Sequence, residues 1–304
     1  MSTRNWLLLF LALLLGTLFI LWLLSRTPPV GPLPALDDEQ RAALLARGRY
    51  LAAAAGCENC HTDREGGGPA LAGGPAIDTP FGRFHAPNIT PDPATGIGRW
   101  RETDFLRAMR YGVGPGGRHL FPVFPYTSYT GMTDTDLRAL WVWLRSVPAV
   151  RRATPPHERP WWLARPLLVP WKALYLRPGP FRPDPARSAQ WNRGAYLVQA
   201  VAHCGECHTP RDALGGLRRD RWLAGNPDGP EGEAVPNITP ARRTGIGRWS
   251  EADLLDFFQT GMLPDGDYVG SVMADVVDYG LARLSEADRR AIVAYLKSLP
   301  PLGD

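Results

Sequence analysis

The sequence predicts an all-α protein in which two tandem, loop-rich domains follow one N-terminal transmembrane helix. Three observations predict this fold class: an uncharged apolar stretch at the N-terminus, an internal repeat across the rest of the chain, and an amphipathic segment at the end of each repeat. The length of 304 residues suits two domains with a connector, and the 31 prolines and 32 glycines favour loops over long regular elements. Little alternation of apolar and polar residues indicates strands.

The N-terminal segment, residues 1–30, is expected to be a membrane anchor or a signal segment. Nineteen uncharged residues run from Trp6 to Leu24, between Arg4 and Arg26, which is close to the ~20 residues that span a bilayer as a helix. No A-x-A-like cleavage site follows, so an uncleaved anchor is favoured over a signal peptide. Either way, we expect the chain from residue 27 onward to be exported.

An internal repeat divides the exported part. "RGRYLAAAAGCENCHT" (47–62) returns as "RGAYLVQAVAHCGECHT" (193–209) with one residue inserted, and "PNITPDPATGIGRW" (87–100) returns as "PNITPARRTGIGRW" (236–249) at an offset of 149. The repeat predicts a first domain at 38–150, a Pro- and Trp-rich connector at 151–186, and a second domain at 187–304.

Each repeat ends on an amphipathic segment with clear helix signals. Thr133 with Asp136, and Ser285 with Asp288, form the capping-box pattern in which a hydroxyl and a carboxylate satisfy free amides at a helix start. A proline closes each segment, because it cannot continue a helix. We therefore expect terminal helices at 133–148 and 285–300, and further helices before each cysteine cluster at about 38–56 and 189–203.

The connector is rich in tryptophan, leucine and arginine. Its prolines exclude a transmembrane helix. Two interpretations stay open: a belt of apolar side chains that packs across both domains, or a surface that touches lipid or a partner subunit.

Two clusters, "CENCH" and "CGECH", contain all four cysteines of the chain. C-x-x-C-H is the attachment pattern of haem c, because two thiols three residues apart reach the two vinyl groups of one porphyrin and the histidine then binds the iron. Structural zinc needs four closed ligands, and a redox dithiol needs a βαβ setting, and neither is indicated. We predict two covalently attached haem c groups, held by Cys57, Cys60 and His61 and by Cys204, Cys207 and His208.

The sixth iron ligand is predicted for the second haem and stays open for the first. Met273 lies 65 residues after His208, and a methionine there suits the distal face of the second haem. The 149-residue offset pairs Met273 with Phe124, which cannot bind iron. For the first haem three alternatives stay open: Met132, His119, or no protein ligand.

The repeated PNITP stretch is expected to be a rigid loop. Asn88 and Asn237 could hydrogen-bond around the haems, with Trp100 and Trp249 on the propionate side. Alternatively, the asparagines serve turn chemistry and the tryptophans belong to the core.

Charge does not indicate nucleic-acid binding. The formal net charge is +4, but the 34 basic residues form no dense run. Four haem propionates would bring the total to about zero.

With these motifs the chain resembles the cytochrome c subunits of bacterial membrane-bound dehydrogenases, which serve alcohol, gluconate, aldehyde or nicotinate-type oxidations. The resemblance covers roughly residues 38–304 and includes "FPVFPYTSYTGMTDTDLRALWVWLRSVP" and "GSVMADVVDYGLARLSEADRRAIVAYLKSLPP". It implies two tandem class I cytochrome c-like domains without a catalytic site of their own. Many relatives carry three haems where this chain has two, and many have Met where it has Phe124.

The resemblance also implies the partners and the location. The electron donor would be a catalytic dehydrogenase subunit with flavin, quinoprotein or molybdopterin chemistry, and the acceptor a quinone, an oxidase or a small cytochrome of the respiratory chain. The expected location is the bacterial cytoplasmic (inner) membrane, with the haem domains in the periplasm. The alternative is a dihaem enzyme, peroxidase-like or thiosulfate-oxidising, that uses an open first haem.

Overall fold

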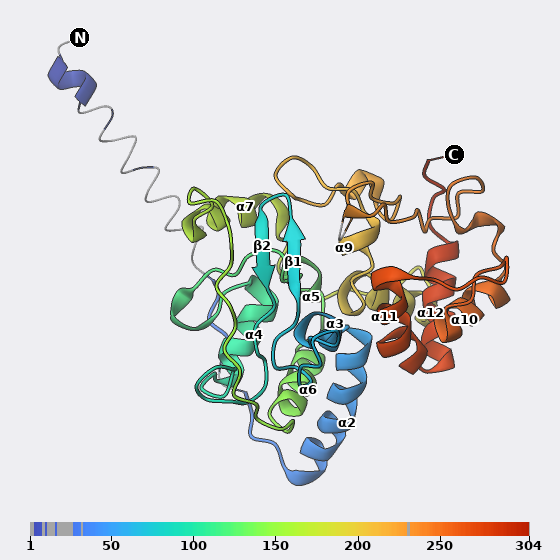
Figure 1. Ribbon diagram of the computed structural model, residues 1–304, viewed down its shortest axis with the longest axis horizontal. Helices are drawn as coiled ribbons and strands as arrows, with labels where there is room; N and C mark the ends of the chain where they lie inside the picture. Colours follow the sequence, from blue (N-terminus) through green and yellow to red (C-terminus); the bar gives the residue numbers. More distant parts are fainter. Residues whose placement is uncertain are drawn as a thin grey trace.

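The computed structural model describes residues 3–7, 10, 16, 27–31, 33–229 and 232–303. Figure 1 shows two mainly helical lobes side by side, one blue to green and one orange to red, with the connector between them in sequence. Within the described ranges, no helix is long and apolar enough to cross a membrane. The expected anchor, Trp6 to Leu24, lies largely outside these ranges.

The first lobe has five α-helices and one hairpin among the described residues. They are α2 (Asp38–Ala54), α3 (Cys57–His61), β1 (Ala76–Thr79), β2 (Gly82–His85), α4 (Glu102–Tyr111), α5 (Tyr126–Tyr129) and α6 (Asp134–Leu144), with a 3-10 turn η1 (Pro115–Gly117). The connector contains η2 (Arg165–Leu167) and α7 (Leu168–Tyr175).

The second lobe repeats this order without a hairpin in its described part. Its elements are α8 (Ala189–Tyr196), η3 (Leu197–Val201), α9 (Gly205–His208), η4 (Arg219–Arg221), η6 (Ile246–Arg248), α10 (Glu251–Thr260), α11 (Ser271–Tyr279), η7 (Leu281–Arg283) and α12 (Glu286–Lys297). Expected helices at 38–56, 133–148, 189–203 and 285–300 are confirmed with ends a few residues shorter.

In each lobe the first and last helices cross at a glycine. A Cβ on Gly48 of α2 would lie 2.0 Å from the carbonyl oxygen of Ala139 in α6. The matching distance in the second lobe, from Gly194 of α8 to Ala291 of α12, is 1.9 Å. Only glycine allows this approach, which explains why "RG" opens both copies of the repeat.

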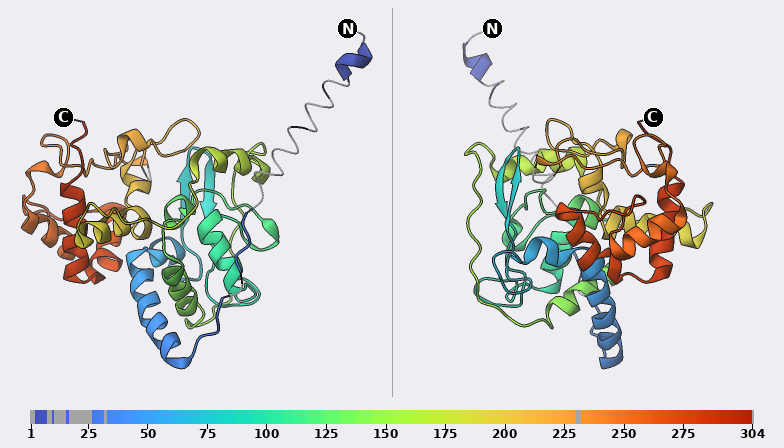
Figure 2. Two further views of the ribbon diagram at one scale, coloured as in Figure 1. Left: turned by 180° about the vertical axis from the view of Figure 1, so that it is seen from behind. Right: turned by 45° about the vertical axis from the view of Figure 1, so that its right-hand side comes forward.

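The hairpin is a feature that the all-α prediction missed. β1 and β2 pair antiparallel from Ala76 with His85 to Thr79 with Gly82. Each strand has four residues, too few to give a clear alternation. The connector completes the outer edge of β2, because Glu158 and Arg83 exchange backbone hydrogen bonds of 2.8 and 2.9 Å. The right-hand view of Figure 2 shows the connector running in yellow-green along this side of the first lobe.

The residue inserted in the second copy of the repeat is absorbed by a π-helix. Leu197–Val201 forms this turn, in which the Ala202 amide donates to the Leu197 carbonyl at 2.7 Å. A π-turn holds one more residue than an α-turn. The insertion therefore leaves the cysteine cluster in the same place relative to the lobe.

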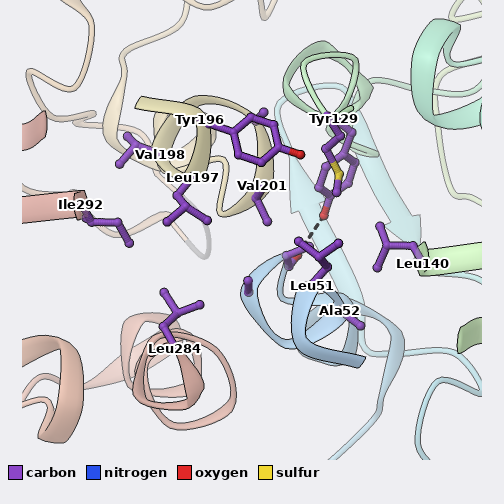
Figure 3. Packing of buried hydrophobic residues seen from close by; sticks show 14 of the residues in the cluster. Leu51, Ala52, Tyr129, Leu140, Tyr196, Leu197, Val198, Val201, Leu284 and Ile292 are labelled. Atoms are coloured by element: carbon purple, nitrogen blue, oxygen red, sulfur yellow. Dashed lines mark hydrogen bonds between the residues drawn. The ribbon is translucent and has the colours of Figure 1, made fainter. Parts of the chain in front are cut away.

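The two lobes share one hydrophobic core. Figure 3 shows Leu51, Ala52, Tyr129 and Leu140 of the first lobe facing Tyr196, Leu197, Val198, Val201, Leu284 and Ile292 of the second. All of these side chains are buried. A large apolar interface holds domains in one arrangement, so the lobes are expected to behave as one body.

A pair of reciprocal hydrogen-bond networks crosses this interface. Tyr196 of the second lobe donates to the carboxylate of Asp136 in the first, which also pairs with Arg47. The Tyr196 oxygen accepts from the Thr133 amide at 3.2 Å. Asp136 is fully buried, so this network supplies its hydrogen bonds where water cannot.

The second network has the roles of the lobes exchanged. Tyr50 of the first lobe donates to Asp288 of the second at 2.6 Å and accepts from the Ser285 amide at 3.2 Å. Arg193 holds the same carboxylate through two bonds of 2.8 and 2.7 Å. The interface is thus a local two-fold pattern produced by the sequence repeat.

These networks modify the predicted capping boxes. Thr133 and Ser285 cap α6 and α12 as expected, each accepting from the amide three residues on. The reciprocal carboxylate bond is absent from both caps, since Asp136 and Asp288 turn to the arginine and tyrosine instead. The predicted hydroxyl caps are therefore confirmed, and the predicted carboxylate bonds to the cap amides are wrong.

Candidate functional site

Both cysteine clusters form short helices directly after the first helix of their lobe. α3 starts after Gly56, which has φ 59°. The matching bend before α9 is made by His203, with φ 41° although it carries a side chain. Each cluster places its two thiols and its histidine on one helical turn, and all four cysteines are free of disulfides.

The two histidines are oriented by proline carbonyls. His61 Nδ1 lies 2.7 Å from the Pro87 oxygen, and His208 Nδ1 lies 2.8 Å from the Pro236 oxygen. A carbonyl can only accept, so Nδ1 carries the proton and Nε2 keeps its lone pair. Burial lowers the pKa of both imidazoles, which keeps them neutral. A histidine that binds a metal is usually in this neutral state and this tautomer, because its other ring N–H donates to a nearby carbonyl or carboxylate.

A threonine and a left-handed leucine complete each site. Thr62 Oγ1 accepts from the Leu71 amide at 3.0 Å, and Thr209 Oγ1 accepts from the Leu223 amide at 2.9 Å. Both leucines have φ 61°, an uncommon value outside glycine. Two positions more than 150 residues apart in the sequence thus share the same strained backbone, so both sites are built to one plan.

The thiols do not have the character of a redox dithiol. Burial raises the pKa of Cys57 and of Cys204 to about 12, and that of Cys207 to about 11, whereas reactive dithiols have a lowered pKa. The side chain of Cys60 has exposed surface, yet burial also raises the pKa of its thiol. Protonated thiols beside a neutral histidine fit a covalently attached haem.

The PNITP asparagines serve the loop. Asn88 Nδ2 donates to the Val150 carbonyl at 2.7 Å, and its Oδ1 accepts from the Thr90 amide at 2.9 Å. Asn237 Nδ2 donates in the same way to the Leu302 carbonyl at 2.6 Å. These bonds support the interpretation that the asparagines stabilise the turn. The group of the PNITP motif that contacts the histidine is the carbonyl of its first proline.

The two tryptophans that close the PNITP stretch are half-buried against the shared core. Trp249 packs edge-to-face on Phe257 with ring centroids 5.5 Å apart, and Trp100 also contacts the core. Both are therefore core residues, whereas a role beside the propionates stays a prediction.

Met273 and Phe124, which the 149-residue offset pairs in sequence, both lie against the shared core. Met273 lies in α11 and Phe124 lies just before α5, and both are half-buried against the shared core. Phe124 packs on Tyr129 with ring centroids 5.7 Å apart. Ligation of the second iron by Met273 stays a prediction.

Met132 is placed in the core between the lobes. Its side chain is fully buried, and its carbonyl accepts from Arg110 at 2.8 Å. Leu284 occupies the same position before the cap of α12, is buried too, and its carbonyl accepts from Arg289 at 2.6 Å. This equivalence gives Met132 a packing role, and its assignment as an iron ligand stays a prediction.

His119 is held by the connector. Lys172 of α7 donates to His119 Nδ1 at 3.1 Å and to the carbonyls of Tyr111 and Gly112 at 2.9 and 2.6 Å. Burial and the nearby Lys172 lower the pKa of His119 to about 4. The Lys172 bonds explain why His119 is ordered, and its ligation of the first iron also stays a prediction.

Sequence reasoning missed two residues at the junction of the clusters. His203 Nε2 donates to the Ala55 carbonyl at 3.3 Å, and Tyr129 donates to the same oxygen at 2.9 Å. Glu206, between the cysteines of the second cluster, accepts from Ser128 at 2.6 Å and from Thr127 at 2.8 Å. Both contacts cross from one lobe to the other, and the sequence offers no local signal for them.

Glu206 is an ionised carboxylate in a buried position. Burial opposes its ionisation, but Arg211 at 2.7 Å and the two hydroxyls outweigh that cost and hold its pKa below the usual range. A negative charge is therefore fixed beside Cys207. The first cluster has the neutral Asn59 at the equivalent position.

Comparison with known proteins agrees with this geometry. The cytochrome c family profile matches residues 45–148 and 192–300, one segment for each cluster. The diheme cytochrome c-type protein of Cereibacter sphaeroides is 41% identical over 279 residues, which cover 88% of this chain and 90% of that protein.

Other relatives are named as parts of dehydrogenases. One of the subunits of nicotinate dehydrogenase from Pseudomonas putida is 45% identical over 261 residues, 85% of this chain and 21% of that relative. The fructose dehydrogenase cytochrome subunit of Gluconobacter japonicus is 38% identical over 278 residues, 90% of this chain and 56% of that relative. The chain thus spans about a fifth and about half of these two relatives.

Proposed function

Because this chain belongs to the cytochrome c family, we propose that it is an electron-transfer subunit with two covalently attached haem c groups. It passes electrons from a catalytic dehydrogenase subunit to the respiratory chain. The observation that carries this proposal is the repeated site: two C-x-x-C-H turns, each with its histidine held by a proline carbonyl.

The residues of the chain have distinct tasks in this function. Cys57, Cys60, Cys204 and Cys207 would hold the porphyrins, and the free Nε2 atoms of His61 and His208 would bind the irons. When bound, each haem supplies an iron that cycles between the ferric and ferrous states. The shared core fixes the two sites relative to one another.

The donor is a dehydrogenase subunit, which the names of the relatives support. Its chemistry is flavin, quinoprotein or molybdopterin, and the acceptor is a quinone, an oxidase or a small cytochrome. The proposed location is the periplasmic face of the bacterial inner membrane, because haem c is attached on that side and residues 6–24 are long and apolar enough for an anchor.

Anaerobic mixing with the dehydrogenase subunit of the same organism tests the function. If the chain transfers electrons, the reduced dehydrogenase reduces both of its haems. Carbon monoxide then does not bind to either haem of the reduced chain. Failure of the dehydrogenase to reduce the chain, together with rapid binding of carbon monoxide at the first haem, would favour the dihaem enzyme instead.

A further inference from the structure

Helix α7 of the connector carries apolar side chains on both of its faces. Its inward face carries Leu168, Val169 and Lys172, all buried, and Lys172 is the one charged residue of the helix. On the outward face Leu174 is 57% exposed, and Leu167, the N-cap residue seven positions earlier, is 51% exposed. Residues seven apart lie on one side of a helix. A surface helix ordinarily turns its charge outward, and α7 has the opposite arrangement.

Exposed apolar side chains continue on both sides of α7. Trp161 is 89% exposed and Trp162 is 49% exposed, just before η2. Leu214, 56% exposed, lies in a loop of the second lobe whose carbonyl accepts from Trp171 Nε1 at 2.8 Å. The side chains of Trp161, Trp162, Leu167, Trp171, Leu174 and Leu214 are called the connector surface below.

The connector surface lies at one end of the molecule. In Figure 1, α7 lies at the top of the first lobe, beside the hairpin, and the N-terminal end of α2 lies at the bottom of the same lobe. Phe81, at the tip of the hairpin, lies against Gly215 in the same loop as Leu214. The surface therefore spans both lobes and the connector.

The connector carries a net positive charge. Residues 151–186 contain seven Arg and Lys but only Glu158 and Asp184, a net charge of +5, although Lys172 is buried and Arg152 pairs with Asp63. The exposed Arg159 and Arg177 donate to the carbonyls of Leu163 and Leu174, at 2.6 and 3.1 Å. These neutral acceptors leave the guanidinium charges available to an anionic neighbour.

We propose that the connector surface lies in the interface of an anionic bilayer, as a second membrane contact independent of the N-terminal segment. Exposed tryptophan and leucine side chains enter the headgroup boundary, where amphipathic rings are favoured. The flanking arginines bind phosphate groups of the lipids, whose negative surface potential attracts them. The inference rests on the proposed membrane location, but not on electron transfer.

Lipid photocrosslinking of the full-length holoprotein tests this contact. The protein is reconstituted into vesicles of phosphatidylglycerol and phosphatidylcholine that contain a photoactivatable phosphatidylglycerol, and lipid adducts are mapped by peptide mass spectrometry. We expect adducts on peptides that cover residues 159–177 and 211–217. A variant with Trp161→Ser, Trp162→Ser and Leu174→Ser loses these adducts several-fold. Leu45→Ser, a matched change at a 37% exposed leucine of α2, leaves them unchanged.

The other outcomes separate the two levels of the proposal. Adducts confined to the N-terminal segment would overturn the second contact and leave the membrane location standing. No adduct anywhere on the chain would overturn both. Adducts on residues 159–177 that vanish when the dehydrogenase subunit is added would assign the connector surface to a protein partner.

Discussion

Removal of the two interface tyrosine hydroxyls is predicted to destabilise the protein unequally. In Tyr196→Phe, Asp136 loses a charge-assisted bond and the Thr133 amide loses its acceptor. A bond to a charged group contributes about 1.5–3 kcal/mol and a neutral one about 1 kcal/mol. The expected loss in the free energy of unfolding is therefore about 2.5–4 kcal/mol, because Asp136 is fully buried and no water replaces the hydroxyl.

The matched change, Tyr50→Phe, is predicted to cost less. Asp288 keeps two bonds from Arg193, at 2.8 and 2.7 Å, after the hydroxyl is removed, and it is slightly exposed. The contact that Asp136 retains, by contrast, is the pair with Arg47, whose side chain is 46% exposed. We expect a loss of about 1–2 kcal/mol for Tyr50→Phe.

Guanidinium unfolding of the holoprotein, followed by circular dichroism in the Soret and far-ultraviolet regions, measures both changes. Each variant is expected to unfold at a lower guanidinium midpoint than the unchanged protein, and the midpoint of Tyr196→Phe is expected to be lower than that of Tyr50→Phe. Changes below about 0.5 kcal/mol in both variants, the range of ordinary surface substitutions, would refute the reasoning. A larger effect of Tyr50→Phe would refute the part that rests on the burial of Asp136.

Three further predictions follow from the cited contacts. Gly194→Ala places a Cβ 1.9 Å from the Ala291 oxygen, and overpacking of this kind lowers the unfolding free energy by about 1–3 kcal/mol, measured in the same denaturation assay. Glu206→Gln removes the negative charge beside Cys207 and raises the midpoint potential of the second haem more than that of the first, in a spectroelectrochemical titration; equal shifts would contradict it. Burial opposes ionisation of Asp288, but its bonds from Arg193 and Tyr50 hold its pKa below the usual range. Stability from this carboxylate is thus complete at neutral pH and falls as pH drops through that lowered pKa, and a midpoint independent of acid pH would contradict this.

Local patterns in the sequence predicted most of the fold. The helix ends follow from Thr133, Ser285 and the closing prolines, whose signals lie within a few residues of the elements that they control. The C-x-x-C-H patterns are local as well, and each lies on one helical turn, while haem attachment at these residues stays a prediction. The hairpin was not, since its short strands depend on the connector for an edge partner.

Long-range contacts account for what the sequence did not reveal. Tyr50 and Asp288 are 238 residues apart and Ser128 and Glu206 are 78 apart, so no periodicity joins them. The repeat held a partial signal, because Tyr50 matches Tyr196 and Asp136 matches Asp288 in the two copies. What it lacked was the information that each tyrosine crosses to the other lobe.

Intact and peptide mass spectrometry of the purified protein tests the central claim most directly. The account predicts a mass gain of two haems, with one on the peptide containing residues 57–61 and one on the peptide containing residues 204–208. Unmodified cysteines in either peptide, or cysteines found as a disulfide or a zinc complex, would contradict it.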